Sequence, residues 1–213
     1  MTQVRTVDGR IAGRRGQATR TRLLECLGEL IASTSYRDVT VIDVARQAGT
    51  SPATFYQYFP DIQTAVVELA NEVLKEAGTL KDLASEQSWT GRGGSAAAAA
   101  LVDGFLDFWR QHDAILRVVD LAAAEGDRRF SRIRMKLLNS VVQALTEAIS
   151  QLQRSGKVDP EVHAAATAGA LVTMLAASAA HTKAFDSWSV KDGELRSGLT
   201  RLVAWGVTGR KPS

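Results

Sequence analysis

The chain has 213 residues, of which 45% are hydrophobic and 23% charged, and its formal net charge is +3. A chain of this length can bury a core without disulfides or a structural metal. One cysteine excludes an internal disulfide, and the scattered histidines leave no zinc-binding set. The basic N-terminus lacks an apolar signal segment and no apolar run approaches ~18 residues, so we expect a cytoplasmic protein without a membrane span.

The excess positive charge lies at the N-terminus, where residues 1–22 contain six arginines and one acid. Residues 1–16 also contain three glycines and are predicted to form a flexible arginine-rich arm. A solvated tail explains these residues when they are considered alone.

Helical periodicity begins at residues 17–34, which place a set of apolar side chains on one face. These side chains are Leu23, Leu24, Leu27, Leu30 and Ile31. Cys26 lies three or four residues from members of this set, so we interpret it as a small buried hydrophobe.

Two short helices follow, near residues 40–48 and 52–58. Thr40 is a good N-cap for the first helix, and Ser51 can cap the second. Pro52 suits the first position of the second helix, because its missing N–H has no helical partner there. Two helices joined by a tight turn make a helix-turn-helix, whose second helix can enter a DNA major groove. Beside such a motif, the arginine arm is expected to follow phosphates or enter a minor groove.

The rest of the chain also shows helical patterns and no strand with period-two alternation. Helices are predicted at residues 62–80, 96–111, 114–125, 130–154, 160–183 and 191–207, with a disordered loop at 85–95. The helix from 160 is expected to use Asp159 as its cap and Pro160 as its first residue. We therefore predict an all-α fold of about nine helices.

The segment from Thr40 to Phe59 resembles the DNA-binding signature of the TetR (tetracycline-repressor-like) family of bacterial regulators. The matching residues are Thr40, Val44, Ala45, Ala48, Gly49, Ser51, Thr54, Tyr56, Tyr58 and Phe59. The motif also lies behind an amphipathic first helix, as it does in that family. The resemblance implies a helix-turn-helix DNA-binding domain at 17–60 and a helical effector-binding and dimerisation domain at 61–208.

DNA contacts are predicted for two kinds of residue in this motif. The hydroxyls of Thr40, Thr54, Tyr56 and Tyr58 are neutral groups that can bind phosphate, whereas Pro52, Ala53 and Gln57 lie nearest the base edges. The full predicted set is Arg14, Arg15, Thr40, Ser51, Pro52, Ala53, Thr54, Tyr56, Gln57 and Tyr58. Ordinary packing also explains the two tyrosines, and a solvated surface position also explains Gln57.

The motif departs from the family pattern at two positions. Ile62 lies where the family usually has a lysine, which removes one phosphate contact, and Ala53 lies where glycine is common. Ile42 and Phe59 are expected to belong to the core of the small domain.

The larger domain is expected, by the same resemblance, to dimerise through its last two helices and to enclose a ligand pocket. Small residues on the helix from 160, with leucines on the last helix, independently favour a four-helix bundle across a two-fold axis. Burial within the monomer also explains that helix. Candidate pocket residues are Phe105, Trp109, Ile133, Leu137, Val141, Thr173 and Met174. Plain core explains each of them alone, and their apolar character favours an apolar or amphipathic ligand.

We therefore predict a homodimeric, ligand-responsive transcriptional regulator, a repressor that binds a pseudo-palindromic operator and needs no cofactor or metal. The alternative is an ungated, nucleoid-type DNA-binding protein, which the basic arm permits. An enzyme is disfavoured, since the sequence has no phosphate-binding glycine loop, metal-ligand spacing or nucleophile elbow.

Overall fold

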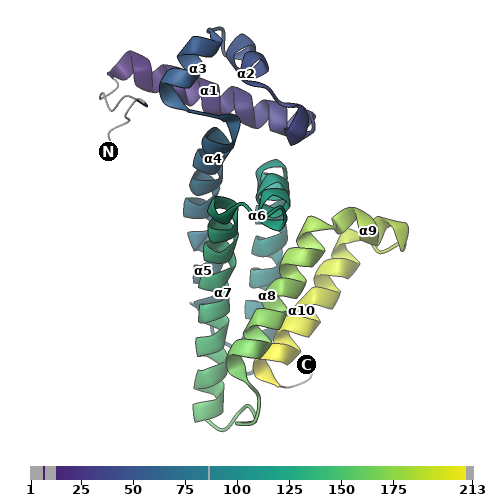
Figure 1. The fold of residues 1–213 in the computed structure, drawn as a ribbon. Helices are drawn as coiled ribbons and strands as arrows, with labels where there is room; N and C mark the ends of the chain where they lie inside the picture. The colour runs from purple at the N-terminus through teal and green to yellow at the C-terminus, as the bar shows by residue number, and fades with distance from the viewer. Residues whose placement is uncertain (1–6, 8–12, 86, 210–213) are drawn as a thin grey trace. The chain divides into compact units, whose positions relative to one another are not determined.

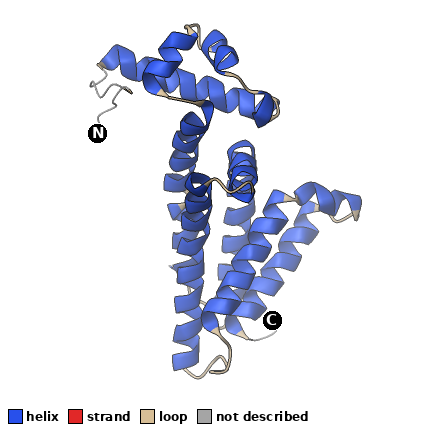
Figure 2. Ribbon diagram, viewed as in Figure 1, coloured by secondary structure: helices blue, strands red, loops and turns tan. Residues whose placement is uncertain are grey.

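The computed structural model describes residue 7 and residues 13–85 and 87–209. Within these ranges every regular element is a helix and none is a strand, which confirms the predicted all-α class (Figure 2). The chain divides into two compact units, residues 1–73 with 114–133 and residues 74–113 with 134–213. The predicted boundary at residue 60 therefore differs from the observed one, because the first unit recruits a later segment.

The first unit contains α1 (Arg14–Ser33), η1 (Tyr36–Asp38), α2 (Val41–Gln47), α3 (Pro52–Tyr58) and most of α4 (Ile62–Glu76), which Figure 1 labels. It also contains the end of α6 (Arg92–Ala124) and the start of α7 (Arg128–Arg154). Its core joins these segments through buried side chains, among them Leu23, Leu27, Val44, Phe55, Phe59, Val66, Val118, Val119 and Phe130. The end of α6 and the start of α7, here called the α6–α7 corner, thus complete the hydrophobic core of α1, α2 and α3.

Local signals determine the two short helices as predicted. Thr40 and Asp43 form a capping box at the start of α2, and the Ser51 hydroxyl accepts a hydrogen bond from the Thr54 N–H at 3.2 Å at the start of α3. Gly49 between the helices has φ +67°, a left-handed conformation that L side chains rarely adopt.

The second unit contains α5 (Gly78–Ser85), most of α6 and α7, α8 (Ala164–Ala180), α9 (Thr182–Ser187) and α10 (Asp192–Thr208). Helices α8 and α10 pack side by side (Figure 1). Its buried side chains include Leu80, Leu101, Phe105, Leu145, Ile149, Leu175, Leu199 and Val203.

Arg196 of α10 ties α10 to α6 in the second unit. Its guanidinium contacts carboxylates of Asp103 at 2.8 Å and Asp107 at 2.6 Å on α6, and Asp192 at 2.8 Å on its own helix. These hydrogen bonds raise the pKa of Arg196 and lower that of Asp192. The three carboxylates thus compensate the charge of a guanidinium whose side chain is only 18% exposed.

The predictions for residues 62–95 were wrong in two respects. The predicted helix 62–80 ends at Glu76, and α5 begins separately at Gly78. The expected loop at 85–95 is also shorter, because α6 already begins at Arg92. Within it, the buried indole of Trp89 donates a hydrogen bond to the Ala84 carbonyl at 2.9 Å, which anchors this connection to α5.

Two further predicted boundaries differ. The helices expected at 96–111 and 114–125 are one element, α6, interrupted at His112, whose φ of −111° and ψ of 15° are not helical. Pro160 does not begin a helix; α8 begins at Ala164, and its cap is His163, whose Nδ1 accepts a hydrogen bond from the Ala166 N–H at 3.2 Å.

Candidate nucleic-acid interface

The amino end of α2 presents the first predicted DNA-contacting residue, Thr40. Its side chain is exposed, but its hydroxyl donates to the Asp43 carboxylate at 2.5 Å and accepts from the Asp43 N–H at 3.2 Å. The capping box therefore already uses this hydroxyl. In this arrangement the hydroxyl hydrogen is not free to donate to a phosphate.

The first turn of α3 presents Ser51, Pro52 and Ala53, all exposed. The Ser51 and Thr54 hydroxyls lie 3.0 Å apart, and the Thr54 side chain is half-buried. Pro52 and Ala53 thus form an exposed apolar surface at the start of the helix. Their side chains can contact a thymine methyl but cannot donate a hydrogen bond.

The second turn of α3 places its two tyrosines differently. Tyr56 is 52% exposed, and its ring meets that of Phe55 edge to face at 5.9 Å. Tyr58 is half-buried and packs against the core of the first unit. Gln57 lies exposed between them.

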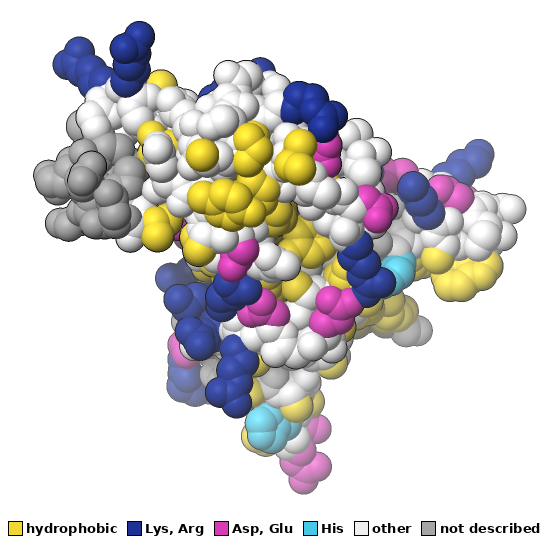
Figure 3. Space-filling view, turned by 45° about the horizontal axis from the view of Figure 1, so that its top comes forward, with side chains coloured by type: hydrophobic (Ala, Val, Ile, Leu, Met, Phe, Trp, Pro, Cys, Tyr) yellow, Lys and Arg dark blue, Asp and Glu magenta, His cyan; other side chains and the backbone are white. Residues whose placement is uncertain are grey.

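Ile42 contradicts its prediction as a core residue, because 58% of it is exposed. The apolar stripe of α2 instead consists of Val41, Val44, Ala45 and Ala48, of which Val44 and Ala45 are fully buried. Hydrophobic side chains gather in the middle of the first-unit surface that Figure 3 brings forward, with basic side chains near its edges. Ile42 joins Pro52, Ala53 and Tyr56 among the exposed apolar residues of the helix-turn-helix.

The N-terminal arginines do not act as one group. Arg14 and Arg15 are exposed in the first turn of α1, so they belong to a helix and not to the predicted arm at 1–16. Arg20 instead pairs with Glu68 at 2.9 Å and lies 5.1 Å from the centre of the Phe59 ring. Arg22 lies 3.6 Å from Glu25. Arg20 and Arg22 therefore have partners within the first unit.

Most of the predicted flexible arm lies outside the described residues. Its one described residue before 13 is Val7, whose N–H donates a hydrogen bond to the Gln57 carbonyl at 2.8 Å. The chain at residue 7 is thus beside the carboxyl end of α3.

Two residues near the motif change the expected distribution of positive charge. Ile62, which replaces the expected lysine, is half-buried and packs against the core of the first unit. Arg46, which is not among the predicted DNA contacts, is an exposed cation on α2 that lies 3.4 Å from Asp43. It is the only basic residue of α2 and lies near the end of that helix, so it could have been found from the sequence.

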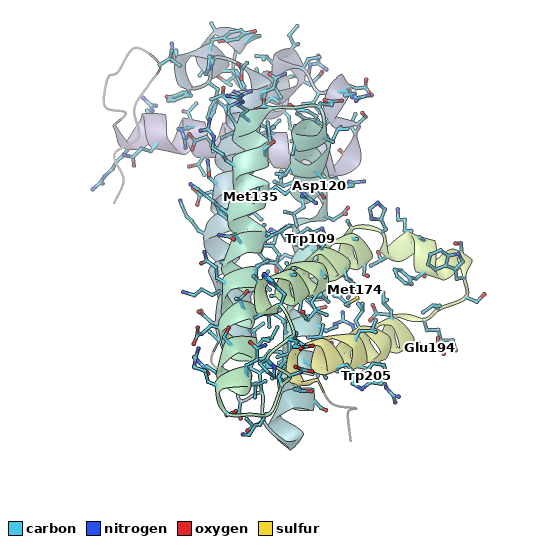
Figure 4. The ribbon with its side chains drawn as sticks, turned by 60° about the horizontal axis from the view of Figure 1, so that its bottom comes forward. Trp109, Asp120, Met135, Met174, Glu194 and Trp205 are labelled. Atoms are coloured by element: carbon cyan, nitrogen blue, oxygen red, sulfur yellow. The ribbon has the colours of Figure 1, made fainter. Side chains whose placement is uncertain are left out.

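The predicted pocket residues separate into three groups. Phe105 and Trp109 stack at 5.0 Å with 9° between their planes, and both are buried, as are Leu137 and Val141. Ile133 is buried in the first unit. The remaining two residues lie on α8: Met174 is half-buried, but Thr173 is exposed, so the expectation that Thr173 faces inward was wrong. Figure 4 labels Trp109 on α6 and Met174 on α8.

The exposed surface of the α8–α10 pair includes a face of small or apolar residues, beside charged ones such as Arg201. On α8 it consists of Ala166, Ala170, Thr173 and Ala177, spaced four, three and four residues apart. On α10 it includes Leu202 and Trp205, both exposed (Trp205 is labelled in Figure 4). Behind this face α8 and α10 pack closely: a Cβ added to Gly206 would lie 2.8 Å from a Leu171 methyl carbon.

Two features are absent from the described part of the chain. No helix there is long and apolar enough to cross a membrane. Nor do His, Cys, Asp or Glu side chains in those residues gather into a group that could hold a metal ion.

Family models match most of the chain. The model described as "Tetracyclin repressor-like, C-terminal domain" matches residues 80–213, and that of "Bacterial regulatory proteins, tetR family" matches residues 28–69.

Two curated relatives are similar over parts of their length. An uncharacterized HTH-type transcriptional regulator of Haemophilus influenzae is 26% identical over 136 residues, which cover 63% of this chain and 64% of that protein. The HTH-type transcriptional regulator EthR of Mycolicibacterium smegmatis is 31% identical over 86 residues, 40% of each chain. The chain thus matches less than two thirds of the length of either relative.

Solved structures share the fold at low sequence identity. The fatty acid degradation regulator FadR of Bacillus halodurans superposes with a TM-score of 0.64 at 16% identity, covering 93% of this chain and 97% of that one. FadR of Bacillus subtilis, solved with stearoyl-CoA, gives 0.62 at 15% identity over 89% and 98%. A tetR-family regulatory protein from Rhodococcus RHA1 gives 0.68 at 16% identity over 89% and 96%.

Proposed function

Because the chain belongs to the tetracycline-repressor-like family of bacterial regulatory proteins, we propose that it is a homodimeric, ligand-responsive repressor of transcription. It binds a pseudo-palindromic operator in the bacterial cytoplasm and leaves that operator when an apolar or amphipathic molecule binds. The observation that carries the proposal is the exposed surface of α3, where Pro52, Ala53, Tyr56 and Gln57 project from a helix capped at Ser51.

In this proposal α3 lies in the major groove and reads bases with its exposed side chains. Gln57 bonds an adenine edge in a bidentate manner, and Ala53 contacts a thymine methyl. The phosphates are bound by Tyr56, by exposed arginines of α1 such as Arg14, and by the N-termini of α2 and α3. Their contribution carries the salt dependence of binding.

The proposed dimer forms through the small, apolar face of α8 and α10. Alanines on α8 allow close approach of the partner helices, and Leu202 with Trp205 supplies apolar area that is exposed in the single chain. A two-fold axis through this face pairs two copies of α3 with two half-sites.

The proposed effector site lies in the second unit around the stacked rings of Phe105 and Trp109. Leu137 and Val141 offer further apolar side chains from α7. This composition favours a fatty-acyl or aromatic ligand, which agrees with the stearoyl-CoA bound to one structurally similar protein, FadR of Bacillus subtilis.

The proposed response is a population shift between DNA-competent and released dimers. Helices α4, α6 and α7 each contribute residues to both units, so a ligand in one unit can bias the other through them. A coupling free energy of ~1–3 kcal/mol is sufficient for such regulation.

Selection of binding sites from random duplexes, followed by footprinting, tests this function. We expect protection of one palindrome with two equal halves, and loss of that protection when a long-chain fatty acyl ligand is added. Uniform protection of any duplex, unaffected by ligand, would favour the alternative of an ungated nucleoid-type protein.

A further inference from the structure

Trp188 is the most exposed tryptophan of the chain. Its exposed fraction is 66%, against 41% for Trp205, whereas Trp89 and Trp109 are buried. It lies directly after α9, where the chain turns from α8 towards α10 at one end of that helix pair (Figure 1). A single exposed apolar side chain is ordinary, so the meaning of Trp188 depends on what surrounds it.

The backbone around Trp188 holds the indole in a defined position. The N–H groups of Trp188 and Val190 both donate to the Phe185 carbonyl at 3.0 Å, and the Ser189 N–H donates to the Asp186 carbonyl at 3.0 Å. Ser189 has φ +59°, a left-handed conformation that closes the turn. A side chain carried by such a closed turn loses little backbone freedom when it contacts a partner.

A second aromatic ring supports the indole. The rings of Phe185 and Trp188 meet edge to face, with their centres 5.3 Å apart and their planes at 83°. Phe185 is half-buried, so part of its surface also remains open to solvent. These two residues, here called the aromatic tip, form an apolar surface larger than that of one side chain.

The aromatic tip lies at the end of the small, apolar face of α8 and α10. On α8 that face runs from Ala166 to Ala177, and His181, four residues further along and directly before α9, is also exposed. On α10 the face continues with Leu202 and Trp205. A molecule that covers the face therefore has the aromatic tip beside it where α8 ends.

The face alone supplies little area for a dimer. Its α8 part consists of three alanines and one threonine, and its α10 part adds two partly exposed side chains. A stable interface buries about 800 Å² on each partner, and one aromatic side chain supplies roughly 150–250 Å². The aromatic tip is thus the nearest source of further apolar area.

We propose that the aromatic tip packs against a second copy of the chain and forms the edge of the dimer interface. The inference rests on the proposed dimer through α8 and α10 and identifies further residues of that interface. Under a two-fold axis each copy contributes one tip, so two equal contacts flank the four-helix bundle. Tryptophan is among the residues that most often dominate the binding energy of an interface.

The test compares the solvent exposure of Trp188 in the dimer and in a monomer. The full chain is labelled with fluorotryptophan, and the fluorine NMR signals are assigned from Trp188→Phe and Trp205→Phe. The shift of each signal between light and heavy water reports the exposure of its ring. We expect a small solvent shift for Trp188 in the dimeric wild type and a several-fold larger one in Trp205→Glu, whose new charge breaks the proposed α8–α10 contact. The buried Trp89 and Trp109 should give small shifts in both proteins.

The possible results separate this inference from the proposed dimer. A large solvent shift for Trp188 in a wild type that sediments as a dimer would overturn the inference and leave the dimer intact. A small shift in both proteins, or one that becomes small only when phosphatidylcholine vesicles are added, would mean that something other than a second copy covers the indole. A monomeric wild type, or a Trp205→Glu variant that still dimerises, would contradict the dimer and with it the inference.

Substitutions at the tip measure its contribution to affinity. Trp188→Ser should weaken dimerisation at least about tenfold in sedimentation velocity, and Trp188→Phe, which keeps an aromatic ring, should weaken it less. Met135→Ser changes another highly exposed apolar side chain, on α7, and should dimerise like the wild type. Thermal unfolding establishes that the variants fold. Equal dimerisation by Trp188→Ser and Met135→Ser would overturn the proposal.

Discussion

Thr40 and Asp43 bond to each other at the amino end of α2 in both directions. The Thr40 hydroxyl accepts from the Asp43 N–H at 3.2 Å, while the Asp43 carboxylate accepts from the Thr40 hydroxyl at 2.5 Å and from the Thr40 N–H at 3.3 Å. A segment of four residues, 40–43, thus fixes the start of the first helix of the helix-turn-helix.

Removing this cap should destabilise the first unit without changing its fold. Thr40→Ala loses the hydroxyl and is expected to lower the free energy of unfolding by about 1 kcal/mol. Thr40→Ser keeps a hydroxyl at the same place and should recover most of that loss. Urea unfolding followed by circular dichroism measures both, and equal stability of Thr40→Ala and the wild type would contradict the role of the cap.

The same pair predicts a pH dependence. The Thr40 hydroxyl bond is the main reason that the pKa of Asp43 lies below its usual 3.8. A carboxyl whose pKa is lowered by folding contributes stability above its unfolded pKa and loses it as pH falls through the folded value. The stability difference between wild type and Asp43→Asn should therefore be constant near neutral pH and shrink below 3.8. A difference that grew on acidification would have the wrong sign.

These short helices were predictable because their signals are local. A cap, a glycine at positive φ and a proline at the first helical position lie within about ten residues of one another. The exposure of Ile42 does not follow from local spacing. Steps of three and four from Val44 and Ala45 lead to Val41 and Ala48, but a step of three back from Ala45 also leads to Ile42.

Other features depend on distant partners and could not be read from the sequence. The α6–α7 corner completes the core of the first unit from residues more than fifty positions beyond α3. Asp159 and Pro160 carry strong start signals, yet Asp159 caps only a turn, where its carboxylate accepts from the Glu161 N–H at 2.9 Å. Gln153 binds the Asp159 carbonyl at 2.9 Å and the Val162 carbonyl at 2.8 Å, which holds that turn against α7.

Arg196 links α10 to α6, so its substitution should destabilise the second unit. Arg196→Met leaves Asp103, Asp107 and Asp192 with less compensation, and Arg110 alone remains beside two of them. We expect the free energy of unfolding to fall by about 1–3 kcal/mol, and by less for Arg196→Lys. Chemical unfolding measures both changes. Arg154→Met, which breaks an exposed pair on α7, is the matched control and should cost less than ~1 kcal/mol.

The dimer proposal makes a prediction about self-association. Trp205→Glu places a charge on the exposed α8–α10 face, and a two-fold interface repeats the change on both copies. We expect at least about tenfold weaker dimerisation, or ~1.4 kcal/mol. Sedimentation velocity reports it, with Met135→Glu on the exposed side of α7 as the control. Equal dimerisation of the two variants would place the interface elsewhere.

The central claim is that the exposed surface of α3 recognises DNA sequence, and its most direct test is the affinity of a double variant for the selected operator. Tyr56→Ala with Gln57→Ala removes two exposed side chains and leaves Phe55 in the core. Fluorescence anisotropy should show at least about a tenfold loss on the operator, with ~1–3 kcal/mol from the base contact of Gln57, and a smaller loss on a scrambled duplex, which loses only the phosphate contact of Tyr56. Gln151→Ala, on α7, should bind the operator like the wild type. A double variant that keeps wild-type affinity and preference for the operator would contradict the claim.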